Sequence, residues 1–251
     1  MINRTLSRGT IAALATATAV AVLTPAAQAA PAAQAAPAAA RTAPVAHTTA
    51  ALPAHLTVDG YQAYLKKNWA KGGRETSAAF KKLTPAQRKK FLLHLEDRKI
   101  HLALRNTVKG NVGHRLHIVN SYDQDVQLVT DVTSRIAGDK VATATLNFTV
   151  SERIYGIPVT TETVTVNFET RGHAKNKNAH AKVTLKNVNA AIAVKASKPK
   201  AVAKGAITNG STVWTATPQV RAFGKKVVKD QLIQSAVTKT GKTFNGRLTN
   251  R

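Results

Sequence analysis

Two long stretches of alternating residues constrain the fold of this chain more than any other feature. Residues 142–151 and 161–168 have a period of two, which is typical of β-strands with one buried face. The apolar face comprises Ala142, Ala144, Leu146, Phe148, Val150, Val164, Val166 and Phe168. The polar face comprises Thr143, Thr145, Asn147, Thr149, Thr161, Thr163, Thr165 and Asn167. We therefore expect a long amphipathic hairpin that turns at Tyr155-Gly156.

The register of this hairpin follows from a turn centred near Gly156. It places apolar residues opposite apolar residues, with Phe148 facing Val164, Leu146 facing Val166 and Ala144 facing Phe168. Glu152 and Glu162 would then lie together near the turn. Each arm is long enough for a bilayer strand, which needs roughly 9 to 11 residues with one apolar face. The same pattern also fits an ordinary β-sandwich with a Thr-rich face in water.

The remainder of residues 111–251 is also predicted to be antiparallel β-structure. Residues 126–136 alternate in the same way and lead into a turn at Ala137-Gly138-Asp139. Val183–Val194 and Ile207–Thr217 are further strand candidates. The fold class is therefore mainly β, with one helical lobe before it.

Residues 55–110 are predicted to form this helical lobe. Thr84 can cap a helix whose first residue is Pro85, and Gln87 can return a hydrogen bond to the cap. An earlier short helix carries Tyr61, Tyr64 and Trp69 and ends at Gly72-Gly73. These three aromatic residues are candidates for binding a surface ligand, with the core of a helical layer as the alternative.

The first 54 residues indicate export. Residues 1–29 have the features of a signal peptide: Arg4 and Arg8, an apolar run over Ile11–Leu23, and the small-x-small sequence Ala27-Gln28-Ala29. Residues 30–54 are rich in Ala and Pro, which predicts an extended linker or pro-segment. We therefore expect a secreted protein.

The net charge of +25 is unevenly distributed. Seven acidic residues lie between Asn120 and Glu169, whereas Arg171–Lys229 contains thirteen Lys and Arg residues and no acid. A basic surface attracts polyanions such as nucleic acid, wall polymers or anionic lipid headgroups. Alternatively, the basic block serves solubility or pairs with the acidic block in the fold.

Catalytic and metal-binding patterns are missing from the sequence. The chain has no cysteine, which excludes disulfides, thiolate metal ligands and a cysteine nucleophile. Neither Gly-x-Ser-x-Gly nor His-Glu-x-x-His occurs. The acidic residues suggest no carboxylate pair embedded among apolar residues, as glycosidases require. His94 and His101 could share a helix face near Glu96 and Asp97, but a solvated polar face is the simpler interpretation. We predict no enzyme activity, no cofactor and no metal.

Three segments between Val119 and Trp214 have a pattern in common with a known family: 119–127 (VNSYDQDVQ), Gly156-Ile157-Pro158-Val159 with the Thr-rich strand that follows, and 191–196 (AIAVKA). In these segments the sequence resembles the aerolysin-type pore-forming toxins, specifically the epsilon-toxin and mosquitocidal-toxin group. In the last segment Lys195 and Ala196 replace the prolines of the family. The resemblance implies an elongated antiparallel β protein that binds a surface, oligomerises and inserts one amphipathic hairpin per subunit.

Two functions are therefore predicted. The first is a secreted β-pore-forming protein whose partners are a target membrane or anionic cell surface and further copies of itself, with a closed barrel because strand edges cannot face lipid. The second is a secreted cationic binding module for wall polyanion or, without sequence specificity, nucleic acid.

Overall fold

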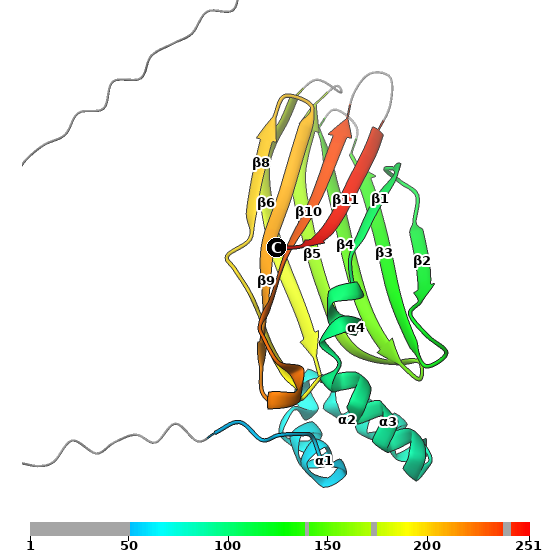
Figure 1. Ribbon diagram of the computed structural model, residues 1–251. Helices are drawn as coiled ribbons and strands as arrows, with labels where there is room; N and C mark the ends of the chain where they lie inside the picture. The colour runs from blue at the N-terminus through cyan, green and yellow to red at the C-terminus, as the bar shows by residue number, and fades with distance from the viewer. Residues whose placement is uncertain (1–50, 139–140, 172–174, 238–241) are drawn as a thin grey trace, which may run out of the picture. The chain divides into compact units, whose positions relative to one another are not determined.

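The computed structural model describes residues 51–138, 141–171, 175–237 and 242–251, all within the unit Thr49–Arg251. The predicted signal peptide and most of the predicted linker lie outside these residues. The helices are α1 (Val58–Lys67), α2 (Gly73–Lys82), α3 (Pro85–Glu96) and α4 (Arg98–Ala103), with short 3-10 turns at Trp69–Lys71 and Arg221–Phe223. Strands follow from Asn106 to the C-terminus (Figure 1).

The helical region agrees with the sequence prediction at the start of α3, where Thr84 and Gln87 form the predicted capping box. The predicted lobe of residues 55–110 extends too far, because β1 begins at Asn106, and Asp97 separates α3 from α4. The sequence prediction also contains no separate helix between Gly72-Gly73 and Thr84, where α2 lies. Gly72 adopts a left-handed conformation with φ of 94°, so it reverses the chain and lets a second helix begin at once. Thr76 and Phe80 form the buried face of α2.

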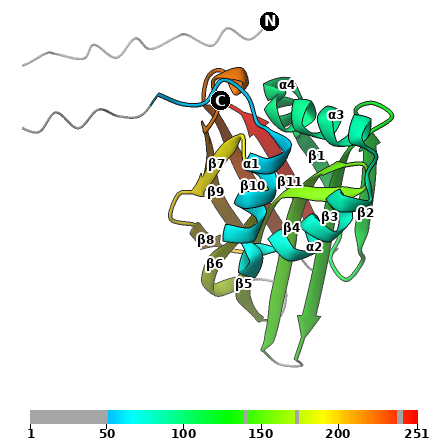
Figure 2. The ribbon, with the colours of Figure 1, turned by 90° about the horizontal axis from the view of Figure 1, so that it is seen from below.

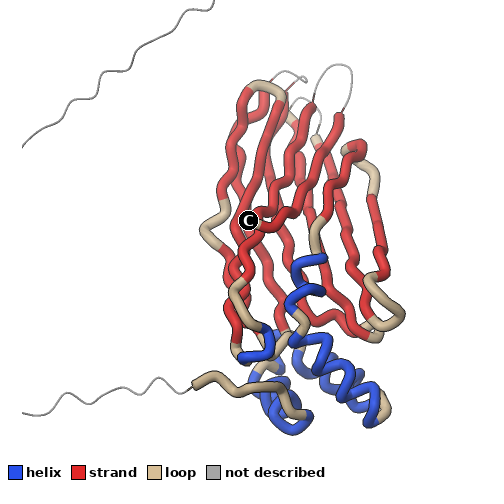
Figure 3. Tube along the Cα trace, viewed as in Figure 1, coloured by secondary structure: helices blue, strands red, loops and turns tan. Residues whose placement is uncertain are grey.

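The strands form two antiparallel sheets, which confirms the prediction of a mainly β chain (Figure 3). One sheet has the order β2-β3-β4-β5-β6. The other has the order β1-β11-β10-β9-β7, and β8 also pairs with β9. The strands of the first sheet are β2 (Leu116–Ser121), β3 (Val126–Ala137), β4 (Ala142–Ile154), β5 (Ile157–Arg171) and β6 (Lys175–Asn187). Those of the second are β1 (Asn106–Asn111), β7 (Ile192–Ala196), β8 (Lys200–Lys204), β9 (Ile207–Pro218), β10 (Val227–Val237) and β11 (Lys242–Asn250).

The β4–β5 hairpin has the register expected from its sequence. Phe148 lies opposite Val164, Leu146 opposite Val166 and Ala144 opposite Phe168. The turn is Tyr155-Gly156, where Tyr155 has a φ of 50° and Gly156 a φ of 75°. The apolar pattern and the turn chemistry together therefore fix the pairing of these strands.

The two sheets pack face to face, and the helices lie at one end of them (Figures 1 and 2). This is the sandwich arrangement that the alternating pattern also allowed. Gln231 links the two layers inside the core. It accepts a hydrogen bond from Trp214 Nε1 at 2.6 Å and donates one to the main-chain oxygen of Phe148 at 2.9 Å. Among the described helices, none has the length and apolar character needed to cross a bilayer.

Candidate functional site

The predicted membrane-inserting face of the hairpin is the core of the sandwich in this structure. Its eight residues are at most 8% exposed: Ala142, Ala144, Leu146, Phe148, Val150, Val164, Val166 and Phe168. The hairpin occupies the centre of its sheet, with β3 paired to β4 and β6 paired to β5. Its apolar face is therefore already packed against the other sheet.

The predicted lumen face lies on the outside of the same sheet. Its polar side chains hydrogen-bond to one another across the strands. Thr145 donates to Asn167 at 2.7 Å, Thr165 donates to Asn147 at 2.7 Å, and the Thr149 and Thr163 hydroxyls are 2.9 Å apart. Such cross-strand pairs stabilise the pairing of β4 with β5 in the sheet. This face carries hydroxyl and amide groups but little charge.

Of the three aromatic residues proposed for surface binding, only Trp69 is exposed. Tyr61 is fully buried, makes an edge-to-face contact with Phe80 and a tilted contact with Phe91, and donates its hydroxyl proton to the main-chain oxygen of Val188 at 3.1 Å. Tyr64 is half-buried against the core. The surface-binding prediction is wrong for Tyr61, because its helix uses that residue as a core anchor.

Trp69 borders a hollow between the helices and the edge strand β6. The side chain is 55% exposed, and the hollow has a volume of about 440 Å³. Its wall is formed by Trp69, Ala70, Lys71, Gly72, Glu75, Leu185 and Lys186. An exposed indole beside two ammonium groups provides a flat ring for stacking and positive charge for an anion.

The edge strand β6 carries a row of basic side chains that ends at this hollow. Lys175, Lys177, His180, Lys182 and Lys186 are all exposed. Lys182 and Lys186 lie opposite Thr165 and Thr161, so they share the outer face of the sheet with the polar hairpin residues. We call these five residues the β6 row. Lysines on an edge strand also discourage pairing with another sheet.

A second basic hollow lies on the outer face of the other sheet. It has a volume of about 490 Å³ and is lined by residues of β8, β9, β10, β11 and the C-terminus. Four of its residues are cationic: Lys198, Lys200, Arg247 and Arg251. Asp230 is its only acid and is paired with Arg251 Nε at 2.7 Å. The hollow therefore keeps a surplus of positive charge.

The basic and acidic blocks do not neutralise each other. Asp125 pairs with Lys90, and Asp131 pairs with Arg115, so these acids use cations outside Arg171–Lys229. Within the described residues, no ion pair joins an acid of 120–169 to a Lys or Arg of Arg171–Lys229. The two blocks meet only in the interior, where Lys229 is buried near Glu152 and Glu162. The exposed lysines of the β6 row make no ion pair with the acidic block within the described residues, so the row stays available.

Four ionisable side chains are buried together between the two sheets and α4, and the sequence predicted only that two of them, Glu152 and Glu162, lie close together. Glu152 and Glu162 come from the hairpin, Lys229 from β10 and His101 from α4, and none is more than 2% exposed. His101 Nδ1 is 3.5 Å from Glu152 Oε2. The expectation that no carboxylate pair is embedded in apolar surroundings is therefore wrong. We call these four residues the interior cluster.

Alternation could have revealed the interior cluster. Lys229 has the same strand parity as Val227 and Ile233, and every second residue of β10 is buried. In the same way, Glu152 continues the apolar face of β4 and Glu162 that of β5. A charge that falls on the apolar side of a strand is the signal that was overlooked.

Burial governs the protonation of the interior cluster. It raises the pKa of Glu152 to about 7 and also raises the pKa of Glu162, although Lys229 opposes both shifts. Burial lowers the pKa of Lys229, which the two carboxylates counteract. It also lowers the pKa of His101, and Lys229 adds to that effect. The uncharged form of each group is therefore favoured.

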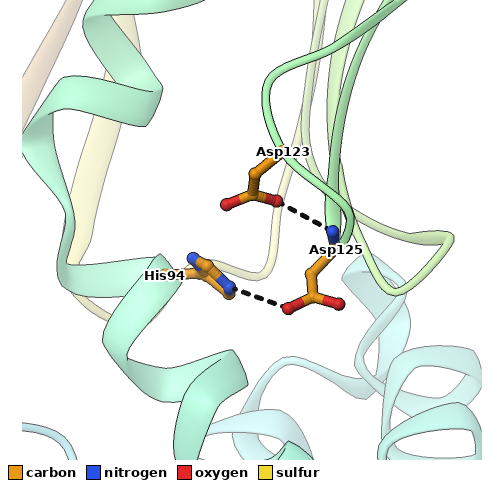
Figure 4. A group of neighbouring side chains, drawn as sticks. All are labelled: His94, Asp123 and Asp125. Atoms are coloured by element: carbon orange, nitrogen blue, oxygen red, sulfur yellow. Dashed lines mark hydrogen bonds and ion pairs between the residues drawn. The ribbon is translucent and has the colours of Figure 1, made fainter.

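His94, Asp123 and Asp125 form a small polar cluster where α3 meets the turn before β3 (Figure 4). Their ligand atoms lie close enough to hold a metal ion. However, Asp125 Oδ2 already contacts Lys90 Nζ and accepts a hydrogen bond from Tyr155 at 3.1 Å. The hydrogen bond from Lys90 is the main reason why the pKa of Asp125 is lowered. A cation would have to displace this ammonium group.

His94 and His101 neither share a helix face nor form the solvated polar face that was the favoured interpretation, because both side chains are largely buried. His94 belongs to α3 and faces Asp125, whereas His101 belongs to α4 and faces Glu152. The break at Asp97, which caps α4, separates the two helices. Glu96 instead pairs with His55 at 2.8 Å.

No family model, curated protein or solved structure matches this chain. Its function must therefore be argued from its own residues.

Proposed function

We propose that this protein is an exported polyanion-binding module that holds phosphate-bearing polymers along the β6 row and in the Trp69 hollow. The observation that carries the proposal is a line of exposed basic side chains that ends at an exposed indole. Phosphates bind to lysine without sequence specificity, and an aromatic ring stacks on sugars or bases. The signal peptide predicted for residues 1–29 is consistent with a target outside the cell.

The lack of nearby ion pairs favours this function over a purely solubilising role. Glu169 is opposite Lys177 and Glu75 lies in the hollow, yet neither makes an ion pair among the described residues. A groove with mainly one sign of charge concentrates a polymer of the opposite sign. The polar, uncharged face of β4 and β5 next to the row adds hydroxyl and amide groups that can hydrogen-bond to phosphate oxygens.

The test is a salt titration of binding to two phosphodiester polymers, single-stranded DNA and poly(glycerol phosphate). Trp69 and Trp214 are the two tryptophans, and Trp214 is buried, so a change in exposed tryptophan fluorescence reports on Trp69. We expect the logarithm of the binding constant to fall linearly with the logarithm of salt concentration, with a slope of about −0.7 per neutralised phosphate for single strands. Preference for either polymer identifies the target class.

The matched variants remove four charges each. One replaces Lys175, Lys177, Lys182 and Lys186 by Gln, and the control replaces Lys66, Lys67, Lys81 and Lys82, which are exposed on α1 and α2. Both have the same net charge. The β6 variant should bind weakly with a nearly flat salt response, whereas the control should keep most of its affinity. Equal losses of affinity in the two variants would mean that binding depends on net charge alone, and the β6 row would not be the binding site.

Pore formation by an aerolysin-like mechanism is the second proposal. The lengths of β4 and β5, 13 and 15 residues, favour it because both exceed the roughly 9 to 11 residues of a bilayer strand. Insertion would require the hairpin to leave β3, β6 and the core. An engineered disulfide between Thr133→Cys and Asn147→Cys, which face each other on β3 and β4, would lock it in place. Release of dye from anionic liposomes in the reduced but not the oxidised state would support this proposal, and no release in either state would refute it.

A further inference from the structure

The interior cluster puts an amine and two carboxyl groups into one apolar compartment. Lys229 projects from β10 of one sheet, and Glu152 and Glu162 project from the opposing sheet. Lys229 Nζ, Glu152 Oε2 and both Glu162 carboxylate oxygens are buried without a hydrogen-bond partner among the described residues. Buried polar groups in proteins are nearly always paired. These groups therefore call for a chemical explanation.

A charged Lys229 and a charged glutamate that are not in contact would each lower the stability of the folded state here. Taking an ammonium and a carboxylate out of water costs several kcal/mol each, and only close pairing recovers it. Lys229 makes no ion pair with either glutamate within the described part of the chain, although both carboxylates act on its pKa, Glu162 more than Glu152. Burial favours the free amine and the free acid. Those are the forms in which an amine attacks a carboxyl carbon.

We propose that Lys229 and Glu162 condense to form an intramolecular amide bond that cross-links the two sheets. The unprotonated Nζ of Lys229 attacks the Cδ of protonated Glu162. The new N–C bond forms, the Cδ–OH bond breaks, and the amine proton and the hydroxyl group leave together as water. The step is a condensation, so it needs no oxidant or reductant. It removes one buried amine and one buried acid and leaves a neutral amide.

Glu152 and His101 are placed to carry the protons of this reaction. A tetrahedral intermediate needs one proton taken from nitrogen and one given to the departing oxygen. Glu152 lies on the same face of the hairpin as Glu162, and its pKa of about 7 lets it both accept and donate near neutral pH. His101 Nδ1 lies 3.5 Å from Glu152 Oε2, without a hydrogen bond between the two atoms. Glu162 is the acyl partner because both of its carboxylate oxygens are buried without a hydrogen-bond partner.

The cross-link gives this cysteine-free chain a covalent tie between its layers. It joins β5 to β10, strands that belong to different sheets and are far apart in sequence. A bond of this kind restricts the unfolded chain in the manner of a disulfide, yet it does not depend on the redox state of the surroundings. An exported protein without cysteines would gain most from such a bond.

The first test is the mass of the purified full chain and its tryptic peptides. We expect the intact chain to be lighter than its sequence by one water molecule, relative to the N-terminus read from the same sample. The tryptic peptides Ile154–Arg171 and Val227–Lys239 should appear as one branched species, because a modified Lys229 is not cleaved. Recovery of both peptides in free form, with cleavage after Lys229, overturns the proposal.

Single substitutions show which side chains form the cross-link. Glu162→Gln can still react, and it should lose ammonia instead of water, so its product should have the same mass as the cross-linked natural chain. Loss of water from this variant would move the bond to Glu152, and no loss of mass would overturn the proposal. Lys229→Met should show no mass loss. Glu152→Gln, checked for folding by circular dichroism, should stay largely unlinked, and full linkage in this variant would remove Glu152 from its role as proton carrier.

Discussion

Lys229 and Lys182 are the same residue type, both lie on strands, and both belong to the acid-free block Arg171–Lys229, yet they have opposite environments. Lys229 is fully buried beside two carboxylates, whereas Lys182 is exposed on the edge strand β6. Strand parity makes the difference, because Lys229 falls on the apolar face of β10 and Lys182 on the outer face of β6. Counting charges along the sequence therefore does not distinguish a buried lysine from an exposed one.

Replacing these two lysines should give the largest difference in stability between the interior and the surface. Lys229→Met removes the amine that forms the proposed cross-link between the sheets, and losing a tie of this kind should lower the free energy of unfolding by about 2–5 kcal/mol. Lys182→Met is the matched control and should change it by less than about 0.5 kcal/mol. Urea unfolding of both variants measures the difference. Similar values would mean that the interior cluster contributes no more than the surface.

The pH dependence of stability should also separate the interior from the surface. Burial raises the pKa of Glu152 to about 7, so the folded state holds a proton that the unfolded state loses near its ordinary value of 4.5. The free energy of unfolding should therefore fall as pH rises from about 5 to 7, by on the order of 2–3 kcal/mol. His101 has a lowered pKa and acts in the opposite direction, with stability lost as pH falls below its ordinary value of 6.5.

Glu152→Gln isolates the first of these two contributions. The variant should lose the fall in stability between about pH 5 and 7 and retain the loss at lower pH that comes from His101. Chemical denaturation at a series of pH values gives the two profiles. An unchanged profile would assign the pH dependence to groups outside the interior cluster.

On the surface, the largest single effect should come from Trp69. Trp69→Ala removes the stacking ring and should weaken binding to single-stranded DNA by about 1–3 kcal/mol, with little change in the salt slope. Trp69→Phe keeps a ring and should restore part of the affinity. Because the indole fluorescence is lost in both variants, fluorescence anisotropy of labelled DNA is the measurement. A loss of slope without a loss of affinity at low salt would contradict the stacking role.

The smallest expected effect is that of Lys182→Gln alone. One phosphate contact contributes about 0.7 to the salt slope for a single strand, and the protein itself should be as stable as before. Lys66→Gln, on α1, should leave the slope unchanged. Equal slopes in all three proteins would place the polymer elsewhere, and the hollow of Lys198, Lys200, Arg247 and Arg251 would be the next surface to change.

Much of the fold could be predicted because its signals are local. Alternation and turn chemistry predicted the three apolar pairs of the β4–β5 hairpin but not the register shift between Glu152 and Arg153, and the Thr84 capping box predicted the start of α3. The helix α2 was missed because Gly72 both ends one turn and starts the next helix. The order of strands in the second sheet rests on contacts between residues far apart in the chain, which the local pattern does not specify.

The candidate site was predictable only in part. Composition identified the basic block, but the β6 row needed the strand boundaries and its place at a sheet edge. The interior cluster joins residues from α4, β4, β5 and β10, and only the packing of the sheets brings them together. Tyr61 lies on the buried face of α1, whereas Trp69 lies in the 3-10 turn after that helix and is exposed.

The amide of Gln231 has a consequence for how the layers can move. Its oxygen and its nitrogen are both used, one by the Trp214 indole and the other by the Phe148 carbonyl. A glutamate there has no proton to give when ionised, and a leucine would strand both partners in an apolar interior. Any sliding of one sheet along the other therefore has to break both hydrogen bonds of Gln231 in the apolar interior.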